Sequence, residues 1–285
     1  MKVGFVGTGN MGAPMARNLA AAGHAVTGYD TATGMPEGVT PAAAAAEAAR
    51  DADVVVTMLP NGDILRRVAA EVIPAMRAGA VLLDCSTVDV ESARAVAADA
   101  AAAGLGALDA PVSGGIGGAD AGTLTFMVGG ADEALAIARP LLDVMGGRVV
   151  HCGAAGAGQA AKICNNMVLG ATMAVTCEAF ALADRLGLSR AALYDVMSTS
   201  SGQSWSVTTY CPAPGVGPTA PSDNGYAPGF AAELMVKDLD LARRAAEAVG
   251  ALTPMGLAAL AEYEAFVTSG GRGQDFSALL PRLAP

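Results

Sequence analysis

The first 30 residues carry the pattern that most constrains how this chain can fold. An apolar run, VGFVG at residues 3–7, leads directly into GTGNMG at residues 7–12, and a second apolar run ends at Asp30. Glycines at these spacings allow a tight turn, a close approach of the backbone to a ligand, and close packing of the following helix on the strand. The N–H groups at the start of that helix would face a negatively charged pyrophosphate. Because strand, glycines, helix, second strand and acid occur in this order, we predict a dinucleotide-binding unit rather than a glycine turn beside an exposed aspartate.

The acid at the end of the second run predicts which dinucleotide is bound. Asp30 would accept hydrogen bonds from the adenosine ribose hydroxyls, and its charge would repel a 2′-phosphate. The residues that follow, Thr31-Ala32-Thr33, offer no arginine to bind such a phosphate. We therefore predict NAD as the cofactor, in preference to NADP. The residues expected to contact it in this unit are Gly7, Gly9, Asn10, Met11, Gly12 and Asp30.

The two halves of the chain have different patterns. Up to about residue 152, short β-branched runs alternate with alanine-rich helical segments, which predicts a mostly parallel sheet covered by helices on both faces. After Gly158 helical segments follow, except for about 25 residues between 200 and 230 that lack periodicity. We predict an α/β Rossmann-type doubly wound domain at residues 1–157 and an all-α domain at residues 158–285, joined by a long interdomain helix. The expected strands are 3–7, 25–30, 53–59, 80–86, 107–112, 124–130 and 148–153, and the expected later helices end near 186 and span 190–198, 230–249 and 254–268.

Composition limits the partners of the protein. A net charge of −10 and a pI near 4.6 argue against nucleic-acid and anionic-membrane surfaces, which need clustered basic residues. The five cysteines are odd in number and form no C-x-x-C pair, as expected for reduced thiols in a cytoplasm. Glycines at 7 and 9 interrupt the N-terminal apolar run, and Glu178 and Asp184 interrupt the longest apolar segment. We expect a soluble cytoplasmic protein that acts on a small metabolite, with no nucleic-acid or membrane partner.

Lysine is rare in this chain and therefore informative. Of 17 basic residues, Lys2, Lys162 and Lys237 are the lysines and the others are arginine. Both side chains carry a positive charge, but only lysine can release a proton in a protein. Lys162 and Asn166 are four residues apart in a predicted helix and so share one face. Burial and a nearby positive charge, such as the oxidised nicotinamide ring, would both lower the pKa of a lysine. We predict that Lys162 is a general acid–base, against the alternative of a solvated helix-surface lysine.

Other candidates for proton transfer are few. The sequence shows no metal-ligand cluster, and its histidines are His24 and His151. His24 is expected in the turn before the second strand, where a structural role is the better interpretation. His151 lies near the glycine-rich joint between the two halves and remains an alternative acid–base.

A second glycine cluster follows the predicted strand at residues 107–112. In PVSGGIGG at residues 111–118, the Ser113 hydroxyl and the backbone N–H groups of Gly114 and Gly115 would hold a carboxylate, unless the segment is only a flexible turn. Ligands of open α/β sheets bind at the carboxyl ends of the strands. Leu59, Pro60 and Thr87 are expected at that same edge, in contact with the cofactor.

Four segments in this order, GFVGTGNMG, DCSTVD, DAPVSGG and GAGQAAKICNN, resemble the β-hydroxyacid dehydrogenase family over nearly the whole length. The resemblance implies that Lys162 is the general acid–base and that Ser113, the two glycines after it and Asn166 hold the substrate. It also implies that Lys237, in the segment LMVKDL, contacts the cofactor and that the protein is a homodimer or homotetramer assembled through the helical domain. Val90 departs from the family pattern, which leaves the chemistry unchanged. Phe230 is expected to close over the nicotinamide.

The resemblance implies NAD-dependent oxidation of a small 3-hydroxy acid to its semialdehyde. The segment between 200 and 230 carries Trp205, expected to contact the substrate, and further aromatic residues that would accept a methyl group. This segment resembles family members that oxidise 3-hydroxyisobutyrate to methylmalonate semialdehyde in valine breakdown, which is the reaction we expect. A tartronate or succinate semialdehyde reductase would keep the same catalytic residues and is the alternative. A non-catalytic dinucleotide-binding module is a third interpretation, which the retained Lys162 opposes.

Overall fold

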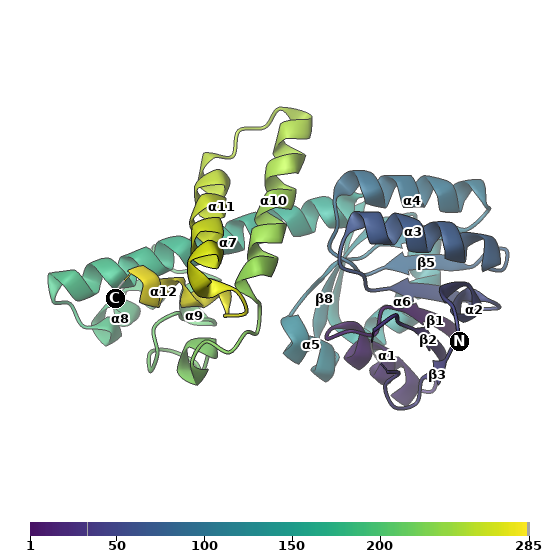
Figure 1. The fold of residues 1–285 in the computed structure, drawn as a ribbon, viewed down its shortest axis with the longest axis horizontal. Coiled ribbons are helices and arrows are strands. Elements are labelled where there is room, and N and C mark those ends of the chain that lie inside the picture. Colours follow the sequence, from purple (N-terminus) through teal and green to yellow (C-terminus); the bar gives the residue numbers. More distant parts are fainter. Residues whose placement is uncertain (33, 284–285) are drawn as a thin grey trace. The chain divides into compact units, whose positions relative to one another are not determined.

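The computed structural model describes residues 1–32 and 34–283, which form two compact units that divide between Lys162 and Ile163 (Figure 1). Thr33, one of the residues expected to follow the ribose-binding acid, lies outside the described residues. The domain boundary expected between residues 157 and 158 stays a prediction, because one helix, α7 (Ala157–Leu186), runs across it without a break.

The first unit is built on one nine-stranded sheet. Its strand order is β3-β2-β1-β4-β5-β6-β8-β7, with β9 paired to β8. Neighbours from β3 to β6 are parallel, β8 is antiparallel to both β6 and β7, and β9 is parallel to β8. The expected mostly parallel sheet is confirmed. The strands are β1 (Lys2–Val6), β2 (Ala25–Tyr29), β3 (Thr40–Pro41), β4 (Val54–Thr57), β5 (Val81–Asp84), β6 (Gly106–Asp109), β7 (Val112–Ser113), β8 (Leu124–Gly130) and β9 (Gly146–Gly153).

Helices cover both faces of this sheet, as a doubly wound fold requires. Side chains alternate along a strand, so Val54 and Val56 join one hydrophobic cluster, with Leu141 of α6 (Asp132–Met145), whereas Val55 joins the other, with Leu65 of α3 (Gly62–Val72). In Figure 1, α3 and α4 lie side by side on one face of the sheet. The helices of this unit are α1 (Gly12–Ala21), α2 (Ala45–Ala49), α3 (Gly62–Val72), the 3₁₀ turn η1 (Ile73–Ala75), α4 (Val90–Ala102), α5 (Gly115–Ala121) and α6 (Asp132–Met145).

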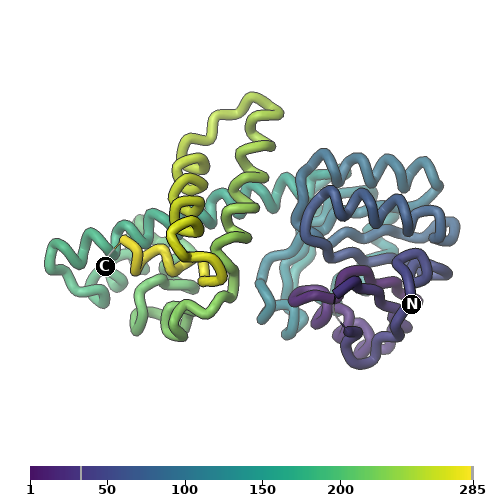
Figure 2. Tube along the Cα trace, viewed as in Figure 1, coloured from purple at the N-terminus to yellow at the C-terminus, as the bar shows by residue number. Residues whose placement is uncertain are grey.

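The second unit is helical, as expected. Its core gathers around Phe180, Met235, Tyr263 and Phe276, and Figure 2 traces the hairpin of α10 and α11 that supplies part of it. Besides the remainder of α7, the elements are α8 (Arg190–Thr199), α9 (Trp205–Thr208), η2 (Pro221–Asn224), α10 (Ala232–Val249), α11 (Pro254–Phe266), a π turn η3 (Val267–Gly271), η4 (Phe276–Ala278) and α12 (Leu279–Leu283).

The strands differ in detail from the sequence-based expectation, which did not include β3. The run expected at 107–112 is two strands, β6 and β7, because Pro111 has no N–H to donate to a sheet.

The helix α7 is long and apolar enough to cross a membrane by length and composition, with a mean hydropathy of 1.4 in its most apolar window, although Glu178 and Asp184 interrupt it. Half of that window (50%) is buried inside the protein, as in a core helix, so this composition is weak evidence for a span.

Candidate active site

The three glycines after β1 perform three different tasks. Gly7 has a φ of 97°, which only glycine adopts readily, and its N–H donates to the Tyr29 carbonyl oxygen at 2.9 Å. A side chain at Gly12 would collide with the carbonyl oxygen of Gly7, so this glycine lets α1 begin directly against the turn. A side chain at Gly9 would meet nothing within 4 Å, which leaves open space over the backbone. The loop therefore fits a pyrophosphate lying against Gly9.

The start of α1 adds to this fit. Met11 precedes the helix and gives it no side-chain cap, and Asn10 beside it is exposed. The first N–H groups of a helix lack intrahelical partners and carry partial positive charge. Together with the open space at Gly9, they form a suitable environment for an anion.

Asp30 is fixed at the end of β2 by the same loop. Its Oδ2 accepts from the Thr8 N–H at 2.7 Å, and its Oδ1 accepts from the Ala32 N–H at 2.8 Å. Each carboxylate oxygen can accept more than one hydrogen bond, so ribose hydroxyls can still be bound. The half-buried carboxylate thus has the position expected of a ribose-binding acid.

The neighbouring strands β4 and β5 end in a buried polar network. The Leu59 N–H donates to Ser86 Oγ at 2.8 Å, which joins the segment carrying Leu59 and Pro60 to the segment carrying Thr87. Asp84, at the end of β5, accepts from Thr57 Oγ1 at 2.7 Å and from Ser86 Oγ at 2.5 Å, both on Oδ1. Burial raises the pKa of Asp84 to about 6. The sequence-based reasoning did not identify Asp84 as part of this edge.

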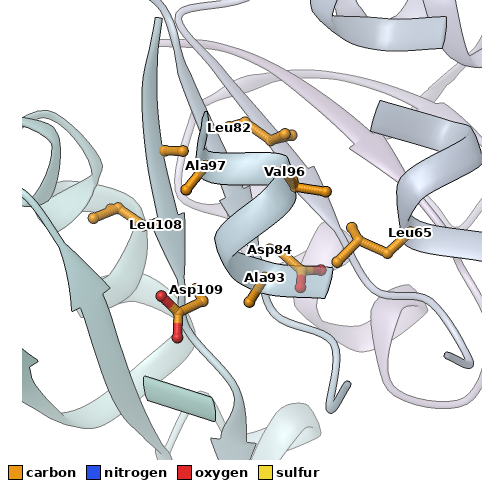
Figure 3. A pocket seen from close by; sticks show the side chains of 9 residues that line it. Leu65, Leu82, Asp84, Ala93, Val96, Ala97, Leu108 and Asp109 are labelled. Atoms are coloured by element: carbon orange, nitrogen blue, oxygen red, sulfur yellow. The ribbon is translucent and has the colours of Figure 1, made fainter. Parts of the chain in front are cut away.

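A small cavity lies beside this network, next to α4. Figure 3 shows Asp84 and Asp109 among aliphatic side chains. None of the predicted site residues lines it, so we interpret it as imperfect packing next to the sheet and not as the substrate site. Its lining residues are Leu65, Leu82, Asp84, Ala93, Val96, Ala97, Ala107, Leu108 and Asp109.

The predicted carboxylate-binding segment lies between β7 and α5. Ser113 ends β7 with a half-buried side chain, and Gly114, at φ 134°, precedes the first residue of α5, Gly115. Gly114 is exposed, so its backbone is accessible to a ligand.

Lys162 lies in the second turn of α7 and is buried, with 7% of its surface exposed. The alternative of a solvated helix-surface lysine is therefore wrong. His151, the other candidate for proton transfer, has one backbone and one side-chain partner: Nε2 lies 2.9 Å from the Gly130 carbonyl oxygen and Nδ1 lies 3.1 Å from an Asp132 carboxylate oxygen. Both ring nitrogens of His151 are thus engaged, which favours a structural role.

Asn166 belongs to the second unit, where its amide is fixed from both ends. Its Nδ2 donates to Asp238 Oδ2 at 2.5 Å, and its Oδ1 accepts from Asn165 Nδ2 at 2.9 Å. The other oxygen of Asp238 lies 3.5 Å from the Nζ of Lys237. Asp238 therefore orients Asn166 and attracts Lys237, a link that the sequence-based reasoning missed. Asp238 lies on the buried face of α10 and is only 4% exposed, but a polar residue on an apolar helix face does not by itself identify Asn166 as its partner.

The aromatic residues of the segment 200–230 contact one another and Asp275. Trp205 stacks on Tyr210 with ring centroids 4.8 Å apart, and the Tyr210 hydroxyl donates to Asp275 Oδ2 at 2.8 Å. The same oxygen accepts from the Gly229 and Phe230 N–H groups, each at 3.0 Å. Trp205 remains 47% exposed, so its ring is available to a ligand.

Comparisons with known proteins agree with this arrangement. The family model for the NAD binding domain of 6-phosphogluconate dehydrogenase matches residues 2–153, and the model for the NAD-binding of NADP-dependent 3-hydroxyisobutyrate dehydrogenase matches residues 156–283. A 3-hydroxyisobutyrate dehydrogenase of Pseudomonas aeruginosa is 49% identical over 295 residues, covering 97% of this chain and 96% of the relative.

Two further proteins are nearly as similar. An NAD-dependent L-serine dehydrogenase of Pseudomonas aeruginosa is 45% identical over 284 residues, covering 97% of this chain and 95% of the relative. The solved structure of Mycobacterium tuberculosis 3-hydroxyisobutyrate dehydrogenase with L-serine has a TM-score of 0.95, 48% sequence identity and 99% coverage of both chains.

Proposed function

Since the chain belongs to the 3-hydroxyisobutyrate dehydrogenase family of NAD-dependent oxidoreductases, we propose that it oxidises 3-hydroxyisobutyrate to methylmalonate semialdehyde. The observation that carries this proposal is the buried Lys162, in a chain that otherwise uses arginine for most of its positive charges. The reaction is the oxidation step of valine breakdown that the sequence led us to expect.

The cofactor is NAD. When bound, it supplies the acceptor for the hydride that leaves the carbinol carbon of the substrate. In the proposal, Gly7, Gly9, Asn10, Met11 and Gly12 hold its pyrophosphate and Asp30 holds its ribose. The family model named for NADP-dependent members matches residues 156–283 and so does not cover Asp30, whose charge opposes a 2′-phosphate.

The remaining cofactor contacts are assigned by position. Leu59, Pro60 and Thr87 follow β4 and β5 at the carboxyl edge of the sheet. Lys237 and Phe230 belong to the second unit. The resemblance to the family supports a cofactor contact for Lys237, and Phe230, seven residues earlier, would close over the nicotinamide.

Lys162 Nζ would take the proton of the substrate hydroxyl during oxidation and return it in the reverse direction. The Ser113 hydroxyl and the backbone at Gly114 and Gly115 would bind the substrate carboxylate, and Asn166 would donate to its oxygens. Trp205 would border the side of the substrate that carries the methyl group. A general acid–base contributes roughly 10²- to 10⁴-fold to turnover, so Lys162→Ala should lose that factor while still binding NAD.

Lys162→Arg distinguishes proton transfer from charge. The guanidinium keeps the positive charge and cannot release its proton, so this variant should be nearly as slow as Lys162→Ala. Wild-type turnover in Lys162→Arg would mean that position 162 supplies only charge, and the acid–base role would be rejected.

L-serine is a second candidate substrate, because one relative is named an L-serine dehydrogenase and one similar structure contains L-serine. L-serine carries an ammonium group where 3-hydroxyisobutyrate carries a methyl group. A methyl group in an apolar pocket is worth only about 1 to 3 kcal/mol, so we expect both to react, with 3-hydroxyisobutyrate preferred. Specificity constants with NAD for 3-hydroxyisobutyrate, 3-hydroxypropionate, L-serine, 4-hydroxybutyrate and glycerate test this, and a higher value for L-serine or glycerate would overturn the substrate assignment.

A homodimer or homotetramer assembled through the helical unit is part of the proposal. Val168, Val175 and Leu182 are spaced by seven residues on α7, and their exposed fractions are 57%, 56% and 59%. Residues at this spacing share one helix face, and contiguous exposed apolar surface of this kind is typical of a protein interface. Val175→Glu should therefore reduce the mass measured by light scattering, whereas Ile137→Glu, which puts the same charge on an exposed apolar residue of α6, should not. We place the enzyme in the cytoplasm, where its free cysteines would stay reduced.

A further inference from the structure

The start of α7 is attached to the sheet by a residue far away in the sequence. The residues before and at its first turn, Ala154-Ala155-Gly156-Ala157, have no side chain that could accept a hydrogen bond, so the helix cannot cap itself. Asp109, at the end of β6, takes this role: its Oδ1 accepts from the Gly156 N–H at 2.7 Å and its Oδ2 accepts from the Gln159 N–H at 2.8 Å. The carboxylate is 5% exposed.

Gln159 makes a second attachment from the helix side. Its Nε2 donates to the Ser86 carbonyl oxygen at 2.8 Å, and its Oε1 accepts from the Val88 N–H at 3.1 Å. The side chain is fully buried. Because both ends of the amide are used, α7 cannot rotate about its axis without breaking one of these bonds. Ser86 and Val88, whose backbone groups bind Gln159, flank Thr87, one of the proposed cofactor contacts.

Close packing supports both attachments. A side chain at Gly158 would collide with the carbonyl oxygens of Met127 and Asp109, and a side chain at Gly129 would lie 2.8 Å from the Gly158 N atom. The first turn of α7 thus lies against β6 and β8 at a distance that only glycine permits.

We infer that Asp109 and Gln159 are positioning residues that hold Lys162 in place for proton transfer. Gln159 and Lys162 are three residues apart and therefore neighbours on the surface of α7. Asp109 fixes where the helix begins, and Gln159 fixes its rotation relative to the segment that carries Thr87. A displacement of about 1 Å at a reacting group can cost about 10²-fold in rate, so loosening this network should slow turnover without removing the lysine. This inference rests on the proposed acid–base role of Lys162.

Two variants test the network in the full-length protein. Asp109→Asn keeps one acceptor oxygen and loses the other, and Gln159→Met keeps the shape of the side chain and loses both hydrogen bonds. Each should lower kcat by roughly 10- to 100-fold. In Asp109→Asn, which leaves the bonds of Gln159 to Ser86 and Val88 in place, the dissociation constant of NAD, measured by fluorescence titration, should change by no more than about twofold. The substrate is the one with the highest rate in the panel above.

Ser189→Ala is the matched control. Ser189 caps α8 by accepting from the Ala192 N–H at 3.2 Å, so the variant also loses a helix cap, but far from the proposed site along the chain. It should lower the melting temperature and leave kcat unchanged, which separates loss of a cap from displacement of Lys162.

A double-mutant comparison provides the decisive readout. If Asp109 acts through Lys162, then Asp109→Asn should not slow the residual turnover of Lys162→Ala any further. The inference would be overturned if Asp109→Asn lowered kcat by the same factor in the wild-type protein and in Lys162→Ala. Wild-type kcat in both Asp109→Asn and Gln159→Met would also overturn it. If Asp109→Asn does not fold, Gln159→Met decides alone, and failure of both to fold would assign the network to the fold and reject the positioning role. Wild-type turnover in Lys162→Ala would instead reject the proposed function.

Discussion

Asp84 is a buried carboxyl group whose ionisation should oppose folding at neutral pH. It is 3% exposed at the end of β5, and its Oδ1 accepts from Thr57 Oγ1 and from both the N–H and the hydroxyl of Ser86. Its Oδ2 has no hydrogen-bond partner within the described residues. Burial, reinforced by the nearby charge of Asp109, outweighs these hydrogen bonds and raises the pKa of Asp84 from 3.8 to about 6.

The pH dependence of stability follows from which state, folded or unfolded, binds the proton of Asp84 more tightly. The pKa of Asp84 is higher in the folded protein than in the unfolded chain, so protonation favours the folded state. This contribution is fully present below pH 3.8 and is lost as the pH rises through about 6. The difference between a pKa of 3.8 and one of about 6 corresponds to about 3 kcal/mol. Asp84→Asn has no proton to lose, and its amide oxygen can still accept from Thr57 and Ser86.

We therefore predict that the stability of Asp84→Asn relative to wild type increases between pH 4 and pH 7. At about 2 to 4 °C per kcal/mol, the difference in melting temperature should rise by roughly 6 to 12 °C over that range. The measurement is calorimetric, because Trp205 is the only tryptophan and its fluorescence reports on the second unit. A destabilisation of Asp84→Asn that does not depend on pH would change the difference in melting temperature equally at every pH. It would leave the slope of that difference against pH unchanged.

The control is Asp53→Asn. A hydrogen bond from the backbone N–H of Lys2 lowers the pKa of the Asp53 carboxyl below its ordinary value of 3.8, and Arg77 lowers this pKa further, by a smaller effect. Asp53 is therefore ionised in both states above about pH 5, and its difference curve should be flat between pH 5 and pH 7. A flat curve for Asp84→Asn as well would refute the reasoning, because it would show that Asp84 titrates alike in the folded and unfolded protein.

Three further predictions concern the cofactor, the substrate and the aromatic segment. Asp30→Ser combined with Thr31→Arg should move preference toward NADP, and an unchanged ratio of Michaelis constants for NAD and NADP would reject Asp30 as the selecting residue. Ser113→Ala and Asn166→Ala should each lower kcat/KM for the hydroxy acid by roughly 10- to 150-fold, because each removes a hydrogen bond to a charged group; if NAD binding fails instead while substrate use is retained, the two sites are assigned the wrong way round. Asp275→Ala leaves the Tyr210 hydroxyl and the Gly229 and Phe230 N–H groups without their acceptor, so it should lower the melting temperature and shift the emission of Trp205, whereas Asp240→Ala should leave the emission unchanged.

The fold was predictable because its signals are local. The glycine pattern after β1 and the β-branched runs of the parallel strands each lie within a few residues, and both appear in the structure where the sequence placed them. β3 was missed and β7 was not separated from β6, because each has only two residues, too few for an alternating pattern. Part of the segment 200–230 is held by hydrogen bonds to Asp275 and not by a regular helix or strand. That part therefore shows no periodicity in the sequence.

The supporting residues of the site were not predictable in the same way. Asp109 contacts residues 47 and 50 positions later, and Asn166 contacts Asp238 across 72 positions. No periodicity in one segment encodes such a pairing, since each partner only acquires its role once the fold brings the two together. Sequence patterns thus indicate the residues that would touch the ligands, whereas the residues that would position them emerge only from the folded chain.

The distribution of basic residues now has a structural explanation. The arginines that form ion pairs lie on or near the surface, as Arg17 does with Asp120 and Arg139 does with Asp143, where a permanent charge in contact with water is sufficient. At position 162 the side chain is buried, and a guanidinium there would bring five fixed N–H donors that need partners and a proton that cannot leave. Lysine brings a smaller head group and a proton that can be exchanged. The rarity of lysine in the chain and the burial of Lys162 are thus independent observations, and both favour proton transfer over charge as the role of this residue.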